Sequence, residues 1–370
     1  MRMLQPHRPL LAMSLICLFG CTTTNHDFKH DLLLTNSKLL MSPEDAMAVG
    51  YRIGWATDLS LSSNEQISSL AVLDDLILVV EAPSNRISAV SLRDGTRRWT
   101  IVLGDATTQL FQPMHRDDRI YVASPARLYT LAARNGELLH VDNFDTPLSS
   151  DPILVRNFAI CGGFSGRLFA HDLTSGYGKW QYDLTTRIEA KPVLAGFDIF
   201  SADTSGVYAM LSSIDGALRW RGRTFGAVTA PPAIDQMAVY LPSKDQTLYA
   251  LDRATGNEKW KLPLEIPLTY SPVSIGLNLY LPLNGHGTVA IDAIAGQVRW
   301  RIPEVAQALQ GDEQRILMAT DSSLQLLDSA NGSTLARGAT GLLQSVLLGP
   351  DDSIVLVSPL GRMLRLNPLK

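Results

Sequence analysis

The sequence contains little cysteine, and this scarcity limits the chemistry open to the protein. Only three cysteines occur in 370 residues, and two of them, Cys17 and Cys21, lie close to the N-terminus. The third, Cys161, has no partner in the rest of the chain, so an intramolecular disulfide is unavailable there. We expect Cys161, in an apolar segment, to be a small buried residue rather than a nucleophile. No His or Cys run has metal-site spacing, so the sequence predicts no metal site. No serine lies in a nucleophile-elbow pattern followed by a helix, and the sequence predicts no catalytic residue.

The sequence also lacks basic clusters and an apolar run long enough for a permanent membrane span. Lys and Arg number 32 against 36 Asp and Glu, and the formal net charge is −4. Because nucleic-acid binding needs concentrated basic residues, we expect no nucleic-acid partner. The apolar run "PLLAMSLICLFG" at 9–20 is too short to remain in a bilayer as a spanning helix.

The N-terminus has the organisation of a secretory leader. Two arginines precede the apolar run, which ends in "LFGC" at Cys21. This ending resembles the bacterial lipobox. The resemblance implies that residues 1–20 are a lipoprotein signal peptide and that Cys21 carries the lipid, palmitate included. The alternative is an ordinary signal peptide followed by a chance cysteine. Thr22 at the next position favours the outer over the inner membrane, a choice that the sequence leaves open.

Residues 21–52 are predicted to be a polar, lipid-anchored tether with one short helix. Ser42 can cap the helix, Pro43 suits its first turn, and acids at 44–45 follow, while Gly50 can end it. The predicted folded domain then covers residues 53–370.

A repeat of about 40 residues runs through the folded domain. Its fixed point is a glycine in a polar turn, followed in most copies by a tryptophan four residues later, as in "ALDRATGNEKW" at 250–260. The glycines are Gly95, Gly136, Gly176, Gly216, Gly256, Gly296 and Gly332, and they are spaced by 41, 40, 40, 40, 40 and 36 residues. The tryptophans are Trp99, Trp180, Trp220, Trp260 and Trp300, with His140 and Ala336 at this place in the other two copies.

Each copy is predicted to contain four short strands. In the copy around Gly256, these are 227–234, 237–243, 247–252 and the strand that carries Trp260. Four strands in about 40 residues is the period of a β-propeller blade. The sixth tryptophan, Trp55, has no strands before it, and the C-terminal stretch supplies only three strands. We therefore predict an all-β, eight-bladed β-propeller of four-stranded antiparallel blades, closed by an N-terminal strand that completes the last blade.

The repeated turn has a mechanical interpretation. Glycine tolerates positive φ, and an Asp four residues earlier, such as Asp252, can accept backbone N–H groups in the same turn. The tryptophan would cover the seam between neighbouring blades, and its indole N–H would need an acceptor there. A small residue six positions before the glycine, such as Ala250, leaves room for the ring. We expect the six tryptophans and seven glycines to be structural docking residues.

The A-x-D-x-x-x-G-x-x-x-W element resembles the tryptophan-docking repeat of pyrroloquinoline-quinone-type propellers, over residues 54–366. One branch of that group, the quinoprotein dehydrogenases, binds its quinone over the propeller axis, typically with calcium and often beside an adjacent Cys–Cys disulfide. This chain has no such cysteine pair after the leader, is shorter, and has every tryptophan in a docking position. We therefore expect no enzyme activity and no cofactor, with a dehydrogenase relative as the less favoured alternative.

The other branch is the lipoprotein family of the outer-membrane β-barrel assembly machinery, the BamB family, which is similar in lipobox, tether, length, closing strand and repeat. The resemblance implies a monomeric propeller within a complex, lipid-anchored at the periplasmic face of the outer membrane, that binds protein partners of that machinery. The connection "TTRIEAKP" at 185–192 has the family's R-x-E-x-x-P spacing, which implies that Arg187 and Glu189 contact the partner. A solvated local ion pair is the alternative. The next connection, 226–232, lacks the acids of the family, and an envelope propeller that binds a polysaccharide or another ligand stays open.

Overall fold

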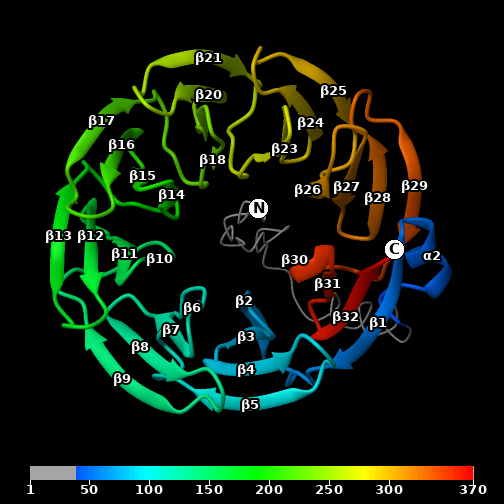
Figure 1. The fold of residues 1–370 in the computed structure, drawn as a ribbon, viewed down its shortest axis with the longest axis horizontal. Coiled ribbons are helices and arrows are strands. Elements are labelled where there is room, and N and C mark those ends of the chain that lie inside the picture. Colours follow the sequence, from blue (N-terminus) through cyan, green and yellow to red (C-terminus); the bar gives the residue numbers. More distant parts are fainter. Residues whose placement is uncertain (1–38, 370) are drawn as a thin grey trace, which may run out of the picture.

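The computed structural model describes residues 39–369, which form a closed ring of eight sheets around a central axis (Figure 1). Each sheet has four antiparallel strands, with the first strand of the sheet nearest the axis and the last on the outside. The predicted eight-bladed propeller is therefore confirmed. The predicted signal peptide, Cys21 and the tether up to residue 38 lie outside the described residues. Within residues 39–369, no helix has both the length and the apolar character needed to cross a membrane.

Blades are numbered along the chain, and the strands of each blade are named from the innermost to the outermost. Blade 1 comprises β2 (Gln66–Leu73), β3 (Leu76–Ala82), β4 (Arg86–Ser91) and β5 (Arg97–Val102). Blade 2 comprises β6 (Met114–Arg116), β7 (Arg119–Ala123), β8 (Arg127–Ala132) and β9 (Leu138–Asn143). Blade 3 comprises β10 (Ile153–Val155), β11 (Phe158–Gly162), β12 (Arg167–Asp172) and β13 (Gly178–Asp183). Blade 4 comprises β14 (Val193–Ala195), β15 (Asp198–Ala202), β16 (Val207–Ser212) and β17 (Leu218–Arg223).

The second half of the ring follows the same plan. Blade 5 comprises β18 (Ala233–Ile234), β19 (Ala238–Pro242), β20 (Thr247–Asp252) and β21 (Glu258–Pro263). Blade 6 comprises β22 (Val273–Ile275), β23 (Asn278–Leu283), β24 (Gly287–Asp292) and β25 (Val298–Ile302). Blade 7 comprises β26 (Gln307–Gly311), β27 (Arg315–Ala319), β28 (Ser323–Asp328) and β29 (Thr334–Ala339). Blade 8 comprises β30 (Ser345–Leu348), β31 (Ile354–Val357), β32 (Arg362–Pro368) and β1 (Tyr51–Asp58), with the 3₁₀ turn η1 (Pro350–Asp352) after β30.

Blade 8 closes the ring because it combines both ends of the domain. Strand β1 pairs antiparallel with β32, from Tyr51 opposite Pro368 to Asp58 opposite Arg362. The predicted closure by an N-terminal strand is confirmed. Strand β1 is the outer strand of blade 8 and covers the edge of β32, which would otherwise be open to association.

The inner strand of blade 5 is shorter than the sequence predicted. In blade 5 the opening strand is β18, Ala233–Ile234, whereas the prediction covered 227–234. Pro231 and Pro232 have no N–H to donate to a neighbouring strand. Residues before them therefore belong to the connection between blades 4 and 5, and the prediction for this strand was wrong.

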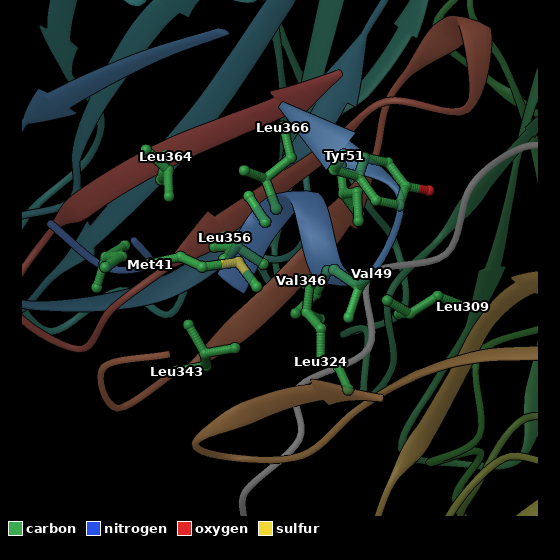
Figure 2. Close-up of a cluster of buried hydrophobic side chains, with 14 of the residues drawn as sticks. Met41, Val49, Tyr51, Leu309, Leu324, Leu343, Val346, Leu356, Leu364 and Leu366 are labelled. Atoms are coloured by element: carbon green, nitrogen blue, oxygen red, sulfur yellow. The ribbon is translucent and has the colours of Figure 1, made fainter. Parts of the chain in front are cut away.

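Helix α2 (Pro43–Ala48) lies where β1 meets blade 7. The Asp45 N–H donates to Ser42 Oγ at 3.0 Å, which caps the helix, and Pro43 occupies its first turn. Figure 2 shows the apolar side chains around α2 and the start of β1 packed against leucines and valines of blades 7 and 8. The helix thus covers the seam between these two blades.

Six of the seams between blades contain a tryptophan. Each indole N–H donates to a backbone carbonyl of the next blade: Trp55 to Leu92 (2.9 Å), Trp99 to Ala133 (2.8 Å), Trp180 to Ser213 (3.3 Å), Trp220 to Arg253 (3.1 Å), Trp260 to Ala293 (3.1 Å) and Trp300 to Ser329 (3.0 Å). Each ring lies against the glycine of the next blade, namely Gly95, Gly136, Gly216, Gly256, Gly296 and Gly332. A Cβ atom on Gly256 would lie 2.6 Å from the Trp220 ring, and its φ of +76° also favours glycine.

The two seams without tryptophan are built differently. Between blades 7 and 8, the tryptophan place is taken by Ala336, which packs against the cluster under α2. Between blades 2 and 3, His140 is exposed and its Nε2 lies 3.0 Å from Asp142 Oδ1, while Asp142 Oδ2 lies 3.6 Å from Nε2 of the buried His171. Here Gly176 lies against the Asp142 carboxylate instead of a ring. At this seam a polar triad stands in place of the indole, beside an apolar cluster in which Phe144 packs edge-on against His171.

Candidate functional site

Strand connections alternate between two faces of the ring, because consecutive strands are antiparallel. We call the face with the links from second to third strand and from blade to blade the connection face. The turn face carries the turns between first and second and between third and fourth strands. The segment 185–192, which the sequence singled out, joins β13 to β14 and lies on the connection face.

A buried carboxylate holds the start of this segment. The N–H groups of Thr185 and Thr186 each donate to Asp203 Oδ2 at 2.8 Å. The other oxygen, Asp203 Oδ1, accepts from the N–H groups of Ser205 (2.8 Å) and Val207 (3.0 Å). Asp203 is fully buried in blade 4, so it ties the connection to the blade that follows it.

The middle of the segment alternates between outward and inward side chains. Ile188 is fully buried, and its N–H donates to the Gly163 carbonyl at 3.3 Å. On either side of it, Arg187 and Glu189 point away from the core and form an ion pair with each other. The guanidinium carbon of Arg187 also lies 5.5 Å from the centre of the Phe164 ring. The structure therefore brings the two predicted partner-binding residues together, with 46% and 28% of their side chains exposed.

The next two connections repeat this construction. Val228 and Leu268 are buried at the positions equivalent to Ile188, and their N–H groups donate to the Asp203 and Ser243 carbonyls at 3.2 Å. The outward side chains differ. In the connection between blades 4 and 5, Phe225 is 95% exposed, and its N–H donates to Asp245 Oδ2 at 3.0 Å.

Phe164, Arg187, Glu189 and Phe225 define what we call the connection-face patch. Phe164 is half-exposed, and Phe225 contributes almost no buried area to the fold. Exposed aromatic side chains are characteristic of binding surfaces, and Phe164 lies beside Arg187. Sequence reasoning missed both phenylalanines. Comparing outward positions across the connections would have found Phe225, since Thr185 and Glu265 occupy the equivalent places.

Two further reactive or charged groups, Cys161 and Lys191, are used within the fold. Cys161 is fully buried on β11, and burial raises the pKa of its thiol far above the usual range. Lys191 donates from Nζ to Gln112 Oε1 at 2.8 Å, and burial lowers the pKa of Lys191. This contact joins the inner ends of blades 2 and 4. Within the described part of the chain, no three His, Cys, Asp or Glu side chains are grouped as a metal site requires.

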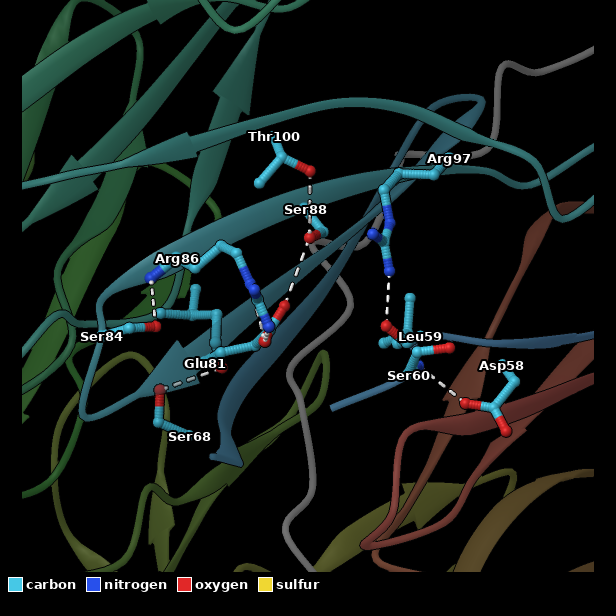
Figure 3. Close-up of polar contacts among 11 residues, drawn as sticks. Asp58, Leu59, Ser60, Ser68, Glu81, Ser84, Arg86, Ser88, Arg97 and Thr100 are labelled. Atoms are coloured by element: carbon cyan, nitrogen blue, oxygen red, sulfur yellow. Dashed lines mark hydrogen bonds and ion pairs between the residues drawn. The ribbon is translucent and has the colours of Figure 1, made fainter. Parts of the chain in front are cut away.

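Blade 1 contains a fully buried carboxylate, Glu81 (Figure 3). It is paired with Arg86 and accepts a hydrogen bond from Ser88 Oγ at 3.2 Å. The hydrogen bond to Glu81 raises the pKa of Arg86. Both charges are therefore satisfied locally, and the pair has a structural role. Figure 3 also shows Arg97 donating to the Leu59 carbonyl, at 2.5 Å, which ties blade 1 to the end of β1.

Comparison with known proteins matches this arrangement to one family model. The model described as outer membrane protein assembly factor BamB matches residues 52–159 and 165–367. The curated outer membrane protein assembly factor BamB of Yersinia pestis is 26% identical over 231 residues, covering 56% of this chain and 58% of the relative. Serine/threonine-protein kinase AfsK of Streptomyces griseus is 25% identical over 222 residues, covering 46% of this chain and 27% of the relative. The chain thus matches less than two thirds of the length of either relative.

Two solved structures show how widely this architecture is shared. BamB from Moraxella catarrhalis superposes with a TM-score of 0.68 at 17% identity, covering 86% of this chain and 99% of that one. Quinohemoprotein alcohol dehydrogenase from Comamonas testosteroni superposes with a TM-score of 0.68 at 13% identity, covering 90% of this chain and 78% of that one. At these identities the likeness establishes the fold alone.

Proposed function

The chain belongs to the family of outer membrane protein assembly factor BamB, and from this membership we propose that it is a non-catalytic scaffold that binds proteins of the outer-membrane β-barrel assembly machinery. The observation that carries the proposal is the connection-face patch, which lies on two neighbouring blade connections and on the turn of blade 3 that carries Phe164. Because the buried Asp203, Ile188 and Val228 fix these connections, a partner meets a preorganised surface and little ordering entropy is lost in the receptor.

Within the patch, we assign different roles to the charged and the aromatic residues. An exposed ion pair such as Arg187–Glu189 contributes little to stability alone. It can instead exchange its internal pairing for contacts with a partner, and so provide specificity. Phe225 and Phe164 would supply affinity, since burying an exposed phenylalanine contributes about 1.5–3 kcal/mol.

Replacing Arg187 by Glu should reduce capture of the barrel-forming subunit from solubilised envelopes at least tenfold. The substitution places two like charges at 187 and 189 and removes the cation beside Phe164. Since the side chain is half-exposed, the free energy of unfolding should change by less than about 0.5 kcal/mol. The measurement is a quantitative pull-down together with a thermal unfolding curve.

Arg219→Glu is the matched control for this capture experiment. Arg219 is a comparably exposed arginine that pairs with Asp198 on blade 4, away from the connection face. The control should capture as well as the native chain. Undiminished capture by Arg187→Glu, or an equal loss in the control, would contradict the assignment of the patch. Failure to recover the barrel-forming subunit with the native chain, under conditions that preserve the complex, would contradict the scaffold proposal itself.

We also propose that a lipid on Cys21 anchors the chain in the outer membrane, with the propeller on the periplasmic side. Metabolic labelling with palmitate should mark the native chain and Cys17→Ser but not Cys21→Ser. The two cysteines are four residues apart, so the pair of variants isolates the position of the lipid. Label retained in Cys21→Ser would refute a lipid on this residue, and fractionation of the labelled chain with the inner membrane would refute the location.

Absence of catalysis is also part of the proposal. It is supported by the engagement of the six tryptophans in seams and by the burial of Cys161. Tight binding of pyrroloquinoline quinone with calcium-dependent dye reduction would contradict the scaffold proposal and favour the dehydrogenase alternative.

A further inference from the structure

The turn face has a composition unlike that of the connection face. Its inner rim consists of the eight turns between the first and second strand of each blade, one turn per blade. These turns occupy equivalent places in the repeat, so their side chains form a ring around the axis. Around this ring the side chains change from apolar to acidic, and the turn of blade 3 carries Arg156, whose guanidinium carbon lies 5.7 Å from the centre of the Phe197 ring.

One half of the ring is apolar and exposed. The turns of blades 4, 5 and 6 carry Phe197, Met237 and Leu277, spaced by 40 residues. The neighbouring turns of blades 4 and 6 add Ile214 and Ile294. All five side chains are between 50% and 73% exposed. We call these five residues the apolar arc.

Backbone contacts place the two kinds of turn side by side on this half. The Ser213 N–H donates to the Phe197 carbonyl at 3.1 Å, which brings Ile214 next to Phe197. The Ala293 N–H donates to the Leu277 carbonyl at 3.0 Å and likewise places Ile294 beside Leu277. The apolar arc thus draws on three neighbouring blades, and between blades 4 and 5 the Arg253 guanidinium lies against Gly196 and donates to the Asp235 carbonyl at 3.1 Å.

The other half of the ring is acidic. The four turns of blades 7, 8, 1 and 2 each present two adjacent exposed carboxylates, which are Asp312, Glu313, Asp351, Asp352, Asp74, Asp75, Asp117 and Asp118. Three arginines flank them, Arg116, Arg119 and Arg315, and His115 lies 3.5 Å from Asp74. We call the eight carboxylates the acidic arc. Negative charge prevails there.

A shallow depression lies on blade 7, which follows the apolar arc around the ring. It is lined by Glu313, Arg315, Asp328 and the half-exposed Leu335, among others. Two carboxylates against one guanidinium leave a place that favours a cation next to apolar surface. The turn face thus offers apolar contact and negative charge in immediate succession.

We propose that the turn face is a second protein-binding surface, and that its partner is a polypeptide segment with an apolar stripe flanked by Lys or Arg. The apolar arc would bury the stripe, and the acidic arc would attract and orient the basic flank. Five exposed apolar side chains on three neighbouring blades are characteristic of a binding surface. This surface lies on the face opposite to the connection-face patch, so both partners can be bound together.

The negative charge of the acidic arc argues against two other occupants, which are an anionic membrane and a second copy of this chain. Anionic lipid headgroups would be repelled by the acidic arc on the same rim. In a face-to-face pair of two copies, the acidic arc would meet either itself or the apolar arc. Neither arrangement neutralises the charge of the acidic arc, and in both the removal of water from the carboxylates costs free energy.

The test uses the full chain carrying Cys21→Ser, so that no acyl chain competes for the apolar arc. The probe is a fluorescent 18-residue amphipathic helix of Leu and Lys, with a Leu and Glu helix of equal length as control. We expect the Lys peptide to bind, and the Glu peptide to bind at least tenfold more weakly. Phe197→Ser with Leu277→Ser should raise the dissociation constant of the Lys peptide at least tenfold. Asp74→Asn with Asp75→Asn should raise it about threefold and reduce its salt dependence.

Phe225→Ser, on the opposite face, is the matched control and should leave binding unchanged. Thermal unfolding of each variant verifies that the ring is intact. Equal binding of both peptides, or binding insensitive to Phe197→Ser with Leu277→Ser, would overturn the proposal. So would co-sedimentation with phosphatidylglycerol vesicles that depends on Phe197, which would identify a membrane surface. A dimer in sedimentation that the same substitutions dissociate would identify a second copy and overturn it as well.

Discussion

Trp220→Ala should lower the free energy of unfolding by about 3–5 kcal/mol, as for other buried tryptophans. The indole lies in the seam between blades 4 and 5, donates to the Arg253 carbonyl at 3.1 Å and is largely buried. Its ring contacts Tyr208 edge-on and covers Gly256 of the next blade. Truncation therefore leaves a cavity and an unsatisfied carbonyl together. Chemical denaturation, followed by circular dichroism, measures the change.

His140→Ala is the control at the equivalent position of the repeat. His140 is 66% exposed and no ring covers Gly176, so this change should cost less than about 1 kcal/mol. Similar losses for the two variants would show that the tryptophan does not hold the seam. A double-mutant cycle with Gly256→Ala adds a second readout. In the native chain the new methyl group would meet the Trp220 ring, but in Trp220→Ala it enters the cavity, so the two losses should not add.

The architecture was accessible from the sequence because its signals are local and repeated. A glycine at positive φ recurs in seven blades, and in five of them the turn also contains an Asp that accepts a backbone N–H and a tryptophan four residues after the glycine. The N-terminal end has Trp55 without strands before it, and the C-terminal end has only three strands. Together these two features predicted that the last blade is shared between the ends of the chain. The length of the inner strand of blade 5 was not predicted correctly. There the prolines of the connections, rather than the apolar pattern, decide where pairing begins.

The candidate site was accessible only in part. Family resemblance indicated Arg187 and Glu189, but their outward orientation depends on Ile188 and on Asp203, a residue of the following blade. Such contacts between blades leave no pattern along one segment. Phe164 and Phe225 are missed for a related reason, since an aromatic residue in an apolar sequence suggests a core position. The polar seam of Asp142 and His171 is likewise invisible, because it forms only when blades 2 and 3 pack together.

Removal of α2 and β1 should have the largest effect of any change to the folded domain. A chain without residues 1–58 would leave blade 8 with three strands and expose the edge of β32. The seam between blades 8 and 1 would lose the Trp55 contact with Leu92, and the buried cluster under α2 would lose Tyr51. We expect its thermal midpoint to fall by more than about 10 °C relative to a chain without residues 1–38, or the ring to remain unclosed.

Complementation can distinguish an unclosed ring from a merely weakened one. A synthetic peptide of residues 39–60 should add to the free edge of β32 as an antiparallel strand and restore cooperative unfolding, because it binds the folded form alone. The same peptide with Trp55→Ala keeps the strand pairing but lacks the ring that covers Gly95. It should therefore restore less stability at equal concentration. If the truncated chain unfolds at the same temperature as its parent, or if both peptides restore it equally, then closure by β1 and Trp55 is not what holds the ring together.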